Sequence, residues 1–311
     1  MKLHQLEDSI TSFRRTVFKY MRLAIIFFAG IVIGLIVYLH HTRRKLKRTK
    51  KQEQVVTITK DKMEGELLVA RKMQESMLHH DVPTDSRYEL AADLQPALQV
   101  SGDLYDFIQD GSKLHFIVAD ISGKGLSASL YMTVTTCTFR TVARLAKEPS
   151  DTLQSINQLI CANNANNIFI TALAGTLDLK TGELKLCSAG HNLPIILNPN
   201  ATKTSLLPQT LRLDANLPLG IIPGCVYKNQ TTYLTPGATL FMYTDGITEA
   251  ANHDFQLFGD ARLEEALVCS SNTPPQRILE NCLKAVENHV NGVPRADDIT
   301  MMAIKFNGSK N

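Results

Sequence analysis

The sequence has no pair of cysteines at the spacing of a metal or redox site. Its six cysteines lie far apart and form no CxxC pair: Cys137, Cys161, Cys187, Cys225, Cys269 and Cys282. This spacing argues against a disulfide framework or a cysteine zinc site and predicts buried thiols in a reducing compartment. We therefore expect the part of the chain after residue 51 to lie in the cytosol.

The sequence after Lys51 also lacks a basic stripe. Residues 1–51 hold 12 Lys and Arg against 2 Asp and Glu, so that of the totals of 33 and 30 the remaining 260 residues carry 21 against 28, a net charge near −7. Nucleic-acid binders need a basic surface for the phosphates. We therefore expect no nucleic-acid partner.

A nucleotide-binding loop is missing as well. Gly123-Lys124-Gly125 carries the end of a GxxxxGK pattern, but Val118 stands where its first glycine is needed. No ATP site is predicted from these residues.

One long apolar run is present near the N-terminus. LAIIFFAGIVIGLIVYL extends from Leu23 to Leu39, and about 17 uncharged residues are the short end of what spans a bilayer. Residues 23–40 are predicted to be a transmembrane helix that follows a basic flank, residues 1–22. A cleaved signal peptide is the alternative, but a basic segment follows the run in place of a cleavage site. The denser basic cluster, residues 43–51, predicts a single pass through the inner membrane with the C-terminal side in the cytoplasm.

Residues 41–82 are predicted to be a basic stop-transfer segment followed by a helical linker. Apolar residues recur every seven positions at Val56, Met63, Ala70 and Met77, while the companion stripe is mostly polar. The pattern predicts a helix from Gln52 to His80, and either a weak coiled coil in a homodimer or a spacer whose apolar face packs on the following domain.

Residues 83–307 are predicted to form one α+β domain, because short apolar runs alternate with turn residues. Strands are expected at 114–121, 173–179, 183–188, 240–244 and 300–306, and helices at 125–146, 263–269 and 275–290.

Acidic residues stand where apolar strands of this domain begin or end: Asp103, Asp120, Asp245, Asp297 and Asp298. One such aspartate alone is more often a turn or cap residue. If strand ends converge, clustered carboxylates repel one another and need cations to stay ionised. Oxygen ligands without metal-spaced histidines favour Mn²⁺ or Mg²⁺, and two such ions can activate water for attack on a phosphoester.

The chain resembles the bacterial PPM serine/threonine phosphatases of the branch named for stage II sporulation protein E. Eight segments carry the resemblance in order: ARKMQESML, SGDLYDF, ADISGKGLSASLYM, NIFITALAGTLD, SAGHNLPI, PLGI, YTDGITEA and ADDITMMAIK. It implies a four-layer α-β-β-α sandwich with two metal ions between the central sheets. It also implies metal ligands and catalytic residues at Asp103, Asp120, Asp245 and Asp297, a backbone ligand at the Ile121 carbonyl, and Asp298 as a close second to Asp297.

Several residues depart from the family pattern. Ser101 and Lys124 stand where many relatives carry Gly and His, and Ser122 stands where eukaryotic relatives carry an acid-supplying histidine. His191 is a candidate acid, although a histidine-stabilised turn is the plainer interpretation. Two further carboxylates, Asp106 and Glu249, either orient metal-bound waters or pair and cap elsewhere.

The resemblance implies a membrane-anchored, metal-dependent phosphatase whose substrate is a phosphorylated protein, such as an anti-sigma-factor antagonist in a partner-switching pathway. In such relatives a helix like ARKMQESML gates metal binding, so residues 70–78 are expected to act as a switch. Two alternatives stay open: a catalytically silent scaffold that binds phosphorylated partners, and a metallohydrolase of small phosphoesters.

Overall fold

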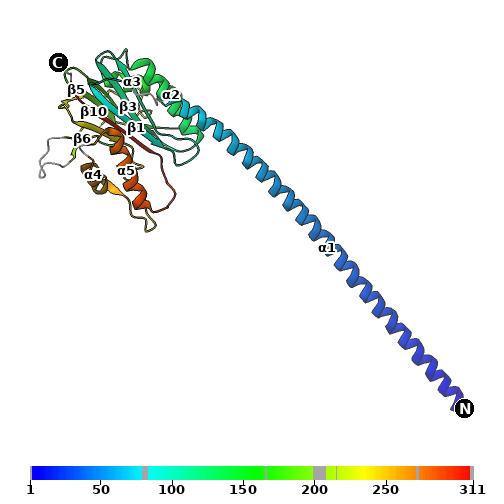
Figure 1. Ribbon diagram of the computed structural model, residues 1–311. Coiled ribbons are helices and arrows are strands. Elements are labelled where there is room, and N and C mark those ends of the chain that lie inside the picture. Colours follow the sequence, from blue (N-terminus) through cyan, green and yellow to red (C-terminus); the bar gives the residue numbers. More distant parts are fainter. Residues whose placement is uncertain are drawn as a thin grey trace. The chain divides into compact units, whose positions relative to one another are not determined.

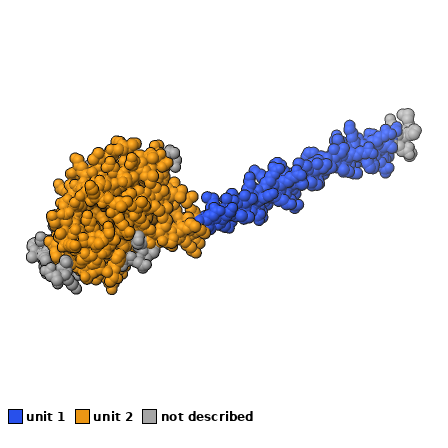
Figure 2. Space-filling view, turned by 90° about the horizontal axis from the view of Figure 1, so that it is seen from above, with its two compact units in different colours: residues 1–66 blue, residues 67–311 orange. Residues whose placement is uncertain are grey.

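The computed structural model describes residues 2–78, 83–164, 167–198, 208–214, 216–270 and 273–308 of the 311-residue chain. The chain divides into two compact units, residues 1–66 and 67–311, which Figure 2 colours separately.

The N-terminal part of the chain is helical. Helix α1 (Lys2–Met77) contains the apolar run and the predicted linker helix up to Met77, and it is labelled in Figure 1. Its most apolar 18-residue window has a mean hydropathy of 2.6 and is not buried, so that by length and composition it could cross a membrane. The last two residues predicted for this helix, His79 and His80, lie outside the described residues.

Two antiparallel sheets form the centre of the second unit. Within the described residues the first sheet has the order β1 (Tyr88–Gln95), β10 (Ile299–Phe306), β9 (Thr239–Tyr243), β6 (Ile195–Leu197) and β7 (Gln209–Thr210). The second has the order β2 (Leu104–Asp110), β3 (Lys113–Ile121), β4 (Ile170–Asp178), β5 (Glu183–Ala189) and β8 (Gln230–Tyr233).

The alternation of side chains along the strands builds the layers. In β3, Phe116 and Val118 enter the core between the sheets, whereas Ile117 and Ala119 enter the core under the helices because successive strand residues face opposite sides. In the same way, β10 directs Met302 into the core between the sheets and Met301 into the opposite one. Both sheets are therefore buried on two faces.

Two helix pairs cover the outer faces (Figure 1). Helices α2 (Leu126–Val142) and α3 (Pro149–Ala162) pack on the second sheet, and α4 (Gly259–Val268) and α5 (Pro275–Val290) share the core of the first. This is the expected α+β fold, a four-layer α-β-β-α sandwich.

The strands and helices predicted for this unit are present, with shifted ends. The largest shifts, of four residues each, are at the end of α2, which is Val142 and not residue 146, and at the start of α4, which is Gly259 and not residue 263. The prediction that all the thiols are buried is wrong: within the described residues the cysteines are free, and Cys137 and Cys269 are exposed while Cys187 and Cys282 are buried.

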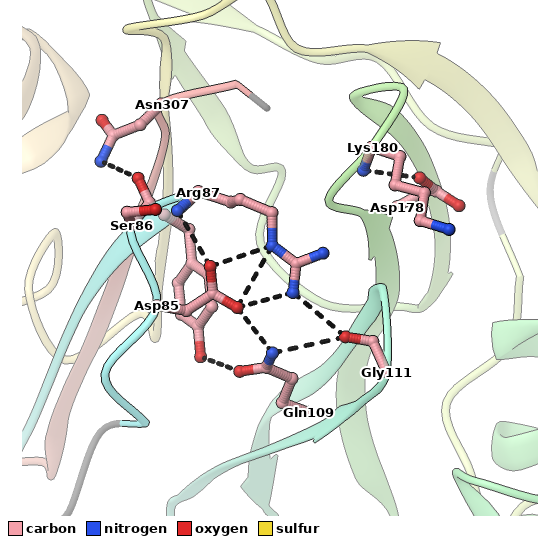
Figure 3. Close-up of polar contacts among 9 residues, drawn as sticks. Asp85, Ser86, Arg87, Gln109, Gly111, Asp178, Lys180 and Asn307 are labelled. Atoms are coloured by element: carbon pink, nitrogen blue, oxygen red, sulfur yellow. Dashed lines mark hydrogen bonds and ion pairs between the residues drawn. The ribbon is translucent and has the colours of Figure 1, made fainter. Parts of the chain in front are cut away.

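A polar network joins the two sheets at the start of β1 (Figure 3). The Asp85 carboxylate accepts hydrogen bonds from the Arg87 guanidinium at 2.6 Å and from the Gln109 amide on β2 at 2.8 Å. Arg87 also donates to the Gly111 carbonyl at the turn after β2. The hydrogen bonds from the Arg87 side chain hold the pKa of Asp85 well below its usual value. This contact fixes the first strand of one sheet to the β2–β3 turn of the other.

Candidate metal centre

The five candidate aspartates lie at neighbouring strand ends of the two sheets. Asp103 precedes β2 and Asp120 is near the end of β3, and these strands pair with Leu104 opposite Ala119. In the other sheet Asp245 follows β9, and Asp297 and Asp298 precede β10, its antiparallel partner. Each sheet thus contributes two adjacent strand ends that carry carboxylates.

The charges of these groups interact. Burial raises the pKa of Asp103 well above its usual value, and the negative charge of Asp120 adds to the shift. Burial also raises the pKa of Asp120 to about 6, with further contributions from Asp245, Asp297 and Asp298. The pKa of Asp245 is raised by burial and by the charges of Glu249 and Asp297. The fold therefore brings all five sequence-predicted aspartates into one electrostatic neighbourhood.

Asp103 is held from the opposite sheet. Its side chain is buried, and one carboxylate oxygen accepts hydrogen bonds of 2.7 Å from the hydroxyls of Thr244 and Thr300. The Thr244 hydroxyl in turn accepts a hydrogen bond from the Thr300 backbone amide. These two threonines, which the sequence analysis missed, follow β9 and lie in β10, and they fix Asp103 against the first sheet.

Asp298 has a different set of partners. Its carboxylate accepts hydrogen bonds from the Ala97 amide at 2.7 Å, the Ser101 hydroxyl at 2.7 Å and the Gly102 amide at 2.8 Å. Through these three short hydrogen bonds the Asp298 carboxylate connects the loop of residues 97–102 to the start of β10. The Ser101 hydroxyl supplies one of the three hydrogen bonds.

Asp297 pairs with a cation. The Lys124 ammonium lies 2.9 Å from the Asp297 carboxylate, and their side chains are 47% and 40% exposed. Lys124 belongs to the loop between β3 and α2, so this ion pair connects the two sheets at the carboxylate cluster.

Two glycines permit the close approach of backbone segments at this place. A Cβ on Gly246, next to Asp245, would lie 1.9 Å from the Asp298 carbonyl oxygen. A Cβ on Gly102 would lie 3.2 Å from the carbonyl oxygen of Ile121, the predicted backbone ligand. Side chains at either position would push apart strand ends that hold the aspartates.

The end of α1 reaches the same loop within the second unit. The buried Gln74 amide donates to the Ser101 carbonyl at 2.7 Å and accepts from the Ser101 amide at 2.9 Å. The Met77 carbonyl accepts a hydrogen bond from Arg140 of α2. Ser101 thus hydrogen-bonds both to Gln74 of α1 and to the Asp298 carboxylate.

Comparison with known protein families shows the family to which the chain belongs. Residues 110–307 match the family model described as stage II sporulation protein E (SpoIIE), which is more than half of the chain. The chain belongs to the SpoIIE family. Asp120, Asp245 and Asp297 of this SpoIIE-family chain fall inside the matched stretch, and Asp103 lies just before it.

Two curated relatives extend the likeness. The chain is 28% identical to Protein IcfG of Synechocystis sp. over 275 residues, which cover 78% of this chain and 42% of that protein. It is 24% identical to the phosphoserine phosphatase RsbU of Bacillus subtilis over 258 residues, which cover 82% of this chain and 74% of RsbU. The chain therefore spans less than half the length of IcfG and about three quarters of RsbU.

Solved structures show the same fold. The SiaA-PP2C domain of Pseudomonas aeruginosa superposes with a TM-score of 0.69 at 19% identity, covering 80% of this chain and 98% of that domain. RsbX, solved in complex with magnesium, superposes with a TM-score of 0.55 at 16% identity, covering 73% of this chain and 98% of RsbX. The second unit of this SpoIIE-family chain therefore has the PP2C fold.

The donor set of the SpoIIE-family site suits a hard divalent cation, because it consists of carboxylate oxygens. Burial, and after it the repulsion from neighbouring carboxylates, raises the pKa of Asp120 and Asp245. In the part of the chain that the structure describes, however, no three His, Cys, Asp or Glu side chains already form a group that could hold an ion. The contacts explain this: Asp103 faces two threonines, Asp298 faces the 97–102 loop, and Asp297 faces Lys124.

The remaining candidates lie in other surroundings. Buried His191 hydrogen-bonds Thr171 through Nδ1 at 2.9 Å, and burial lowers the pKa of its ring to about 4, which agrees with the plainer interpretation of a turn histidine. Asp106 is fully buried and pairs with Arg140 at 2.6 Å, which agrees with its role as the partner of a base. Ser122 accepts a hydrogen bond from the Phe169 amide, and Glu249 is exposed beside Asp245.

Proposed function

We propose that this chain is a metal-dependent protein serine/threonine phosphatase that hydrolyses phosphoserine or phosphothreonine on a protein substrate. The observation that carries the proposal is the gathering of five aspartates from both sheets in a SpoIIE-family domain. The relative RsbU is a phosphoserine phosphatase, and phosphoester hydrolysis by a pair of hard cations needs oxygen ligands of the kind that these aspartates offer.

The residues proposed to hold two Mn²⁺ or Mg²⁺ ions are Asp103, Asp120, Asp245, Asp297 and the Ile121 carbonyl. RsbX, a protein of this fold, was solved with magnesium. Such ions supply Lewis acidity and lower the pKa of water. We assign Asp298 to positioning, because three short hydrogen bonds already engage its carboxylate.

The chain's own residues prepare the site. Thr244 and Thr300 fix one oxygen of Asp103 and thereby orient its carboxylate. Burial of Asp103 keeps bulk water away from its carboxylate, which strengthens its attraction for a cation. No general acid is assigned, since His191 is buried in its turn.

For the substrate we propose a phosphorylated anti-sigma-factor antagonist of a partner-switching pathway. This step rests on the likeness to RsbU and on the acidic character of residues 52–311, which suits a protein partner better than nucleic acid.

For the location we propose a single pass through the inner membrane at residues 23–40, with residues 83–307 as a cytoplasmic phosphatase domain. The length and hydropathy of α1 support a span, and the basic residues 43–51 support this orientation. We further propose that residues 41–82 pair two copies as a coiled coil, a linker that joins the span to the catalytic domain.

The experiment that tests the activity uses the full-length protein in detergent with Mn²⁺ and a phosphoserine protein. We expect phosphate release that falls at least about a hundredfold in Asp120→Asn, Asp245→Asn and Asp297→Asn, with unchanged circular dichroism. Asp110→Asn, an exposed aspartate at the end of β2, is the matched control and keeps its rate.

Two other outcomes are distinguishable. A chain that releases no phosphate, whether wild type or variant, but binds the phosphoprotein is the scaffold. A chain that hydrolyses small phosphoesters far faster than phosphoproteins is a metallohydrolase of small phosphoesters, the other alternative left open by the sequence.

The switch role proposed for residues 70–78 rests on the Gln74 contacts with Ser101. Gln74→Ala removes both hydrogen bonds, and we expect a several-fold change in the Mn²⁺ concentration that gives half-maximal rate. Lys72→Ala, on the exposed side of the same helix, is the control. Equal Mn²⁺ dependence in Gln74→Ala and wild type, and equal rates with and without residues 1–80, contradict the switch.

A further inference from the structure

Lys124 places an ammonium group at the carboxylate cluster. It stands between Gly123 and Gly125, whose φ angles of 95° and 76° turn the loop after β3 sharply. Its Nζ lies 2.9 Å from an Asp297 oxygen and also donates to the Ala296 carbonyl, 172 residues away in sequence. Two acceptors on one short segment hold this cation at a fixed place.

The positive charge reaches more than one candidate ligand. Besides its direct contact with Asp297, Lys124 acts on Asp245, whose pKa it lowers against the larger effect of burial. Among the ion pairs of the described residues, this is the one that engages a proposed metal ligand. An ammonium in contact with Asp297 repels a divalent cation that binds the same carboxylate.

We propose that Lys124 is an internal counter-cation that competes with the divalent metal for Asp297. This inference rests on the proposed function, because it concerns the same carboxylates. Without metal, Lys124 reduces the repulsion among the clustered aspartates and keeps Asp297 in place. Metal binding requires the ammonium to leave Asp297. The affinity for metal is therefore set by the difference between the free energies with which Asp297 binds the metal ion and the ammonium.

The ion pair is half-exposed, so its effect is modest and sensitive to salt. Exposed pairs of this kind change an equilibrium by factors of about 1.5 to 5, and ions in solution screen them further. The flexible lysine stem lets the ammonium move away without a change in the backbone.

The test is Mn²⁺ binding, measured by isothermal titration calorimetry on the full-length, metal-stripped protein in detergent. Lys124→Met removes the charge and keeps the length of the side chain, and Lys124→Arg keeps the charge. The matched control is Lys113→Met, at the other end of β3, where the lysine is exposed.

We expect Lys124→Met to bind Mn²⁺ about three- to fivefold more tightly than wild type at low ionic strength, and this gain to shrink at high KCl. Lys124→Arg and Lys113→Met are expected within about twofold of wild type.

Equal or weaker Mn²⁺ binding by Lys124→Met, with binding by wild type intact, overturns the competition and leaves the proposed function standing. Absence of Mn²⁺ binding in wild type and in every variant overturns both, so the two failures are distinguishable.

Discussion

At the scale of the residue, the surroundings of each carboxylate decide what it can do. Asp297 and Asp298 are adjacent in sequence, yet one pairs with a lysine and the other accepts three hydrogen bonds from the 97–102 loop. Adjacent aspartates therefore have different surroundings, and this difference supports the ligand role proposed for Asp297 and the positioning role proposed for Asp298.

His191 provides a pH-dependent test of burial. Because burial lowers the pKa of its ring from 6.5 to about 4, the unfolded chain binds more protons than the folded chain between these values, and stability falls as the pH falls through this range. From pH 7 to pH 5 this histidine removes about 2 kcal/mol of unfolding free energy.

The measurement compares metal-free wild type and His191→Gln by denaturant unfolding at pH 7 and pH 5. The other titrating groups, including Asp120, contribute equally to both chains, so the difference in pH dependence isolates the histidine. A variant whose stability falls with pH as steeply as that of wild type contradicts the account of the ring as buried and neutral.

Part of the site was predictable at this scale. Asp103 and Asp245 stand at strand ends beside glycines, Asp120 stands near the end of an apolar strand, and this local pattern is visible in the sequence. The Lys124 contact with Asp297, the Thr300 contact with Asp103 and the Gln74 contact with Ser101 join residues that are far apart in the chain. No local pattern predicts such pairs, because they depend on how the two sheets face each other.

At the scale of the element, the five expected strands correspond to β3, β4, β5, β9 and β10, whereas β1 and β2, with eight and seven residues, were missed together with three shorter strands. β3 and β10 are buried along almost their whole length. By contrast β6 and β7 have three and two residues, and β8 alternates between half-buried and exposed positions. Such strands form because a neighbouring strand offers hydrogen bonds, and sequence pattern contributes little.

Helix α3 was missed although its start carries a recognisable pattern. Pro149 occupies the first turn, and the Asp151 carboxylate accepts a hydrogen bond from the Glu148 backbone amide at 3.1 Å. Proline in the first turn with an acidic residue three positions after the cap is typical of a helix N-terminus. The segment KEPSDTLQSI therefore held enough information to predict this helix.

The junction of β9 and β10 supplies a prediction about backbone packing. In Gly246→Ala the new Cβ would lie 1.9 Å from the Asp298 carbonyl oxygen, so the start of β10 must shift. We expect a loss of about 1 to 3 kcal/mol in unfolding free energy and weaker Mn²⁺ binding, measured by denaturant unfolding and by calorimetry.

Gly65→Ala is the matched control, because Gly65 lies in α1 with nothing within 4 Å of a new Cβ. It is expected to leave Mn²⁺ binding unchanged, since alanine only favours the helix. A Gly246→Ala chain as stable as wild type with unchanged Mn²⁺ affinity contradicts the close approach of the two strand ends.

At the scale of the whole molecule, short apolar runs broken by turn residues predicted the α+β class, whereas the four layers were expected from the family resemblance. The two-sided burial of β3 and β10 requires helices on both outer faces, and the structure has them. What the chain recognises depends on surfaces that form only after folding, and therefore the substrate and the pairing of copies are proposals.

The central claim is that this carboxylate cluster acts through divalent metal. The most direct test is phosphate release from a phosphoserine protein by the full-length chain, first in excess chelator and then with Mn²⁺ restored. The account predicts no release in chelator, recovery with Mn²⁺ in wild type, and no recovery in Asp120→Asn. Undiminished release in chelator, or full recovery in Asp120→Asn, would contradict it.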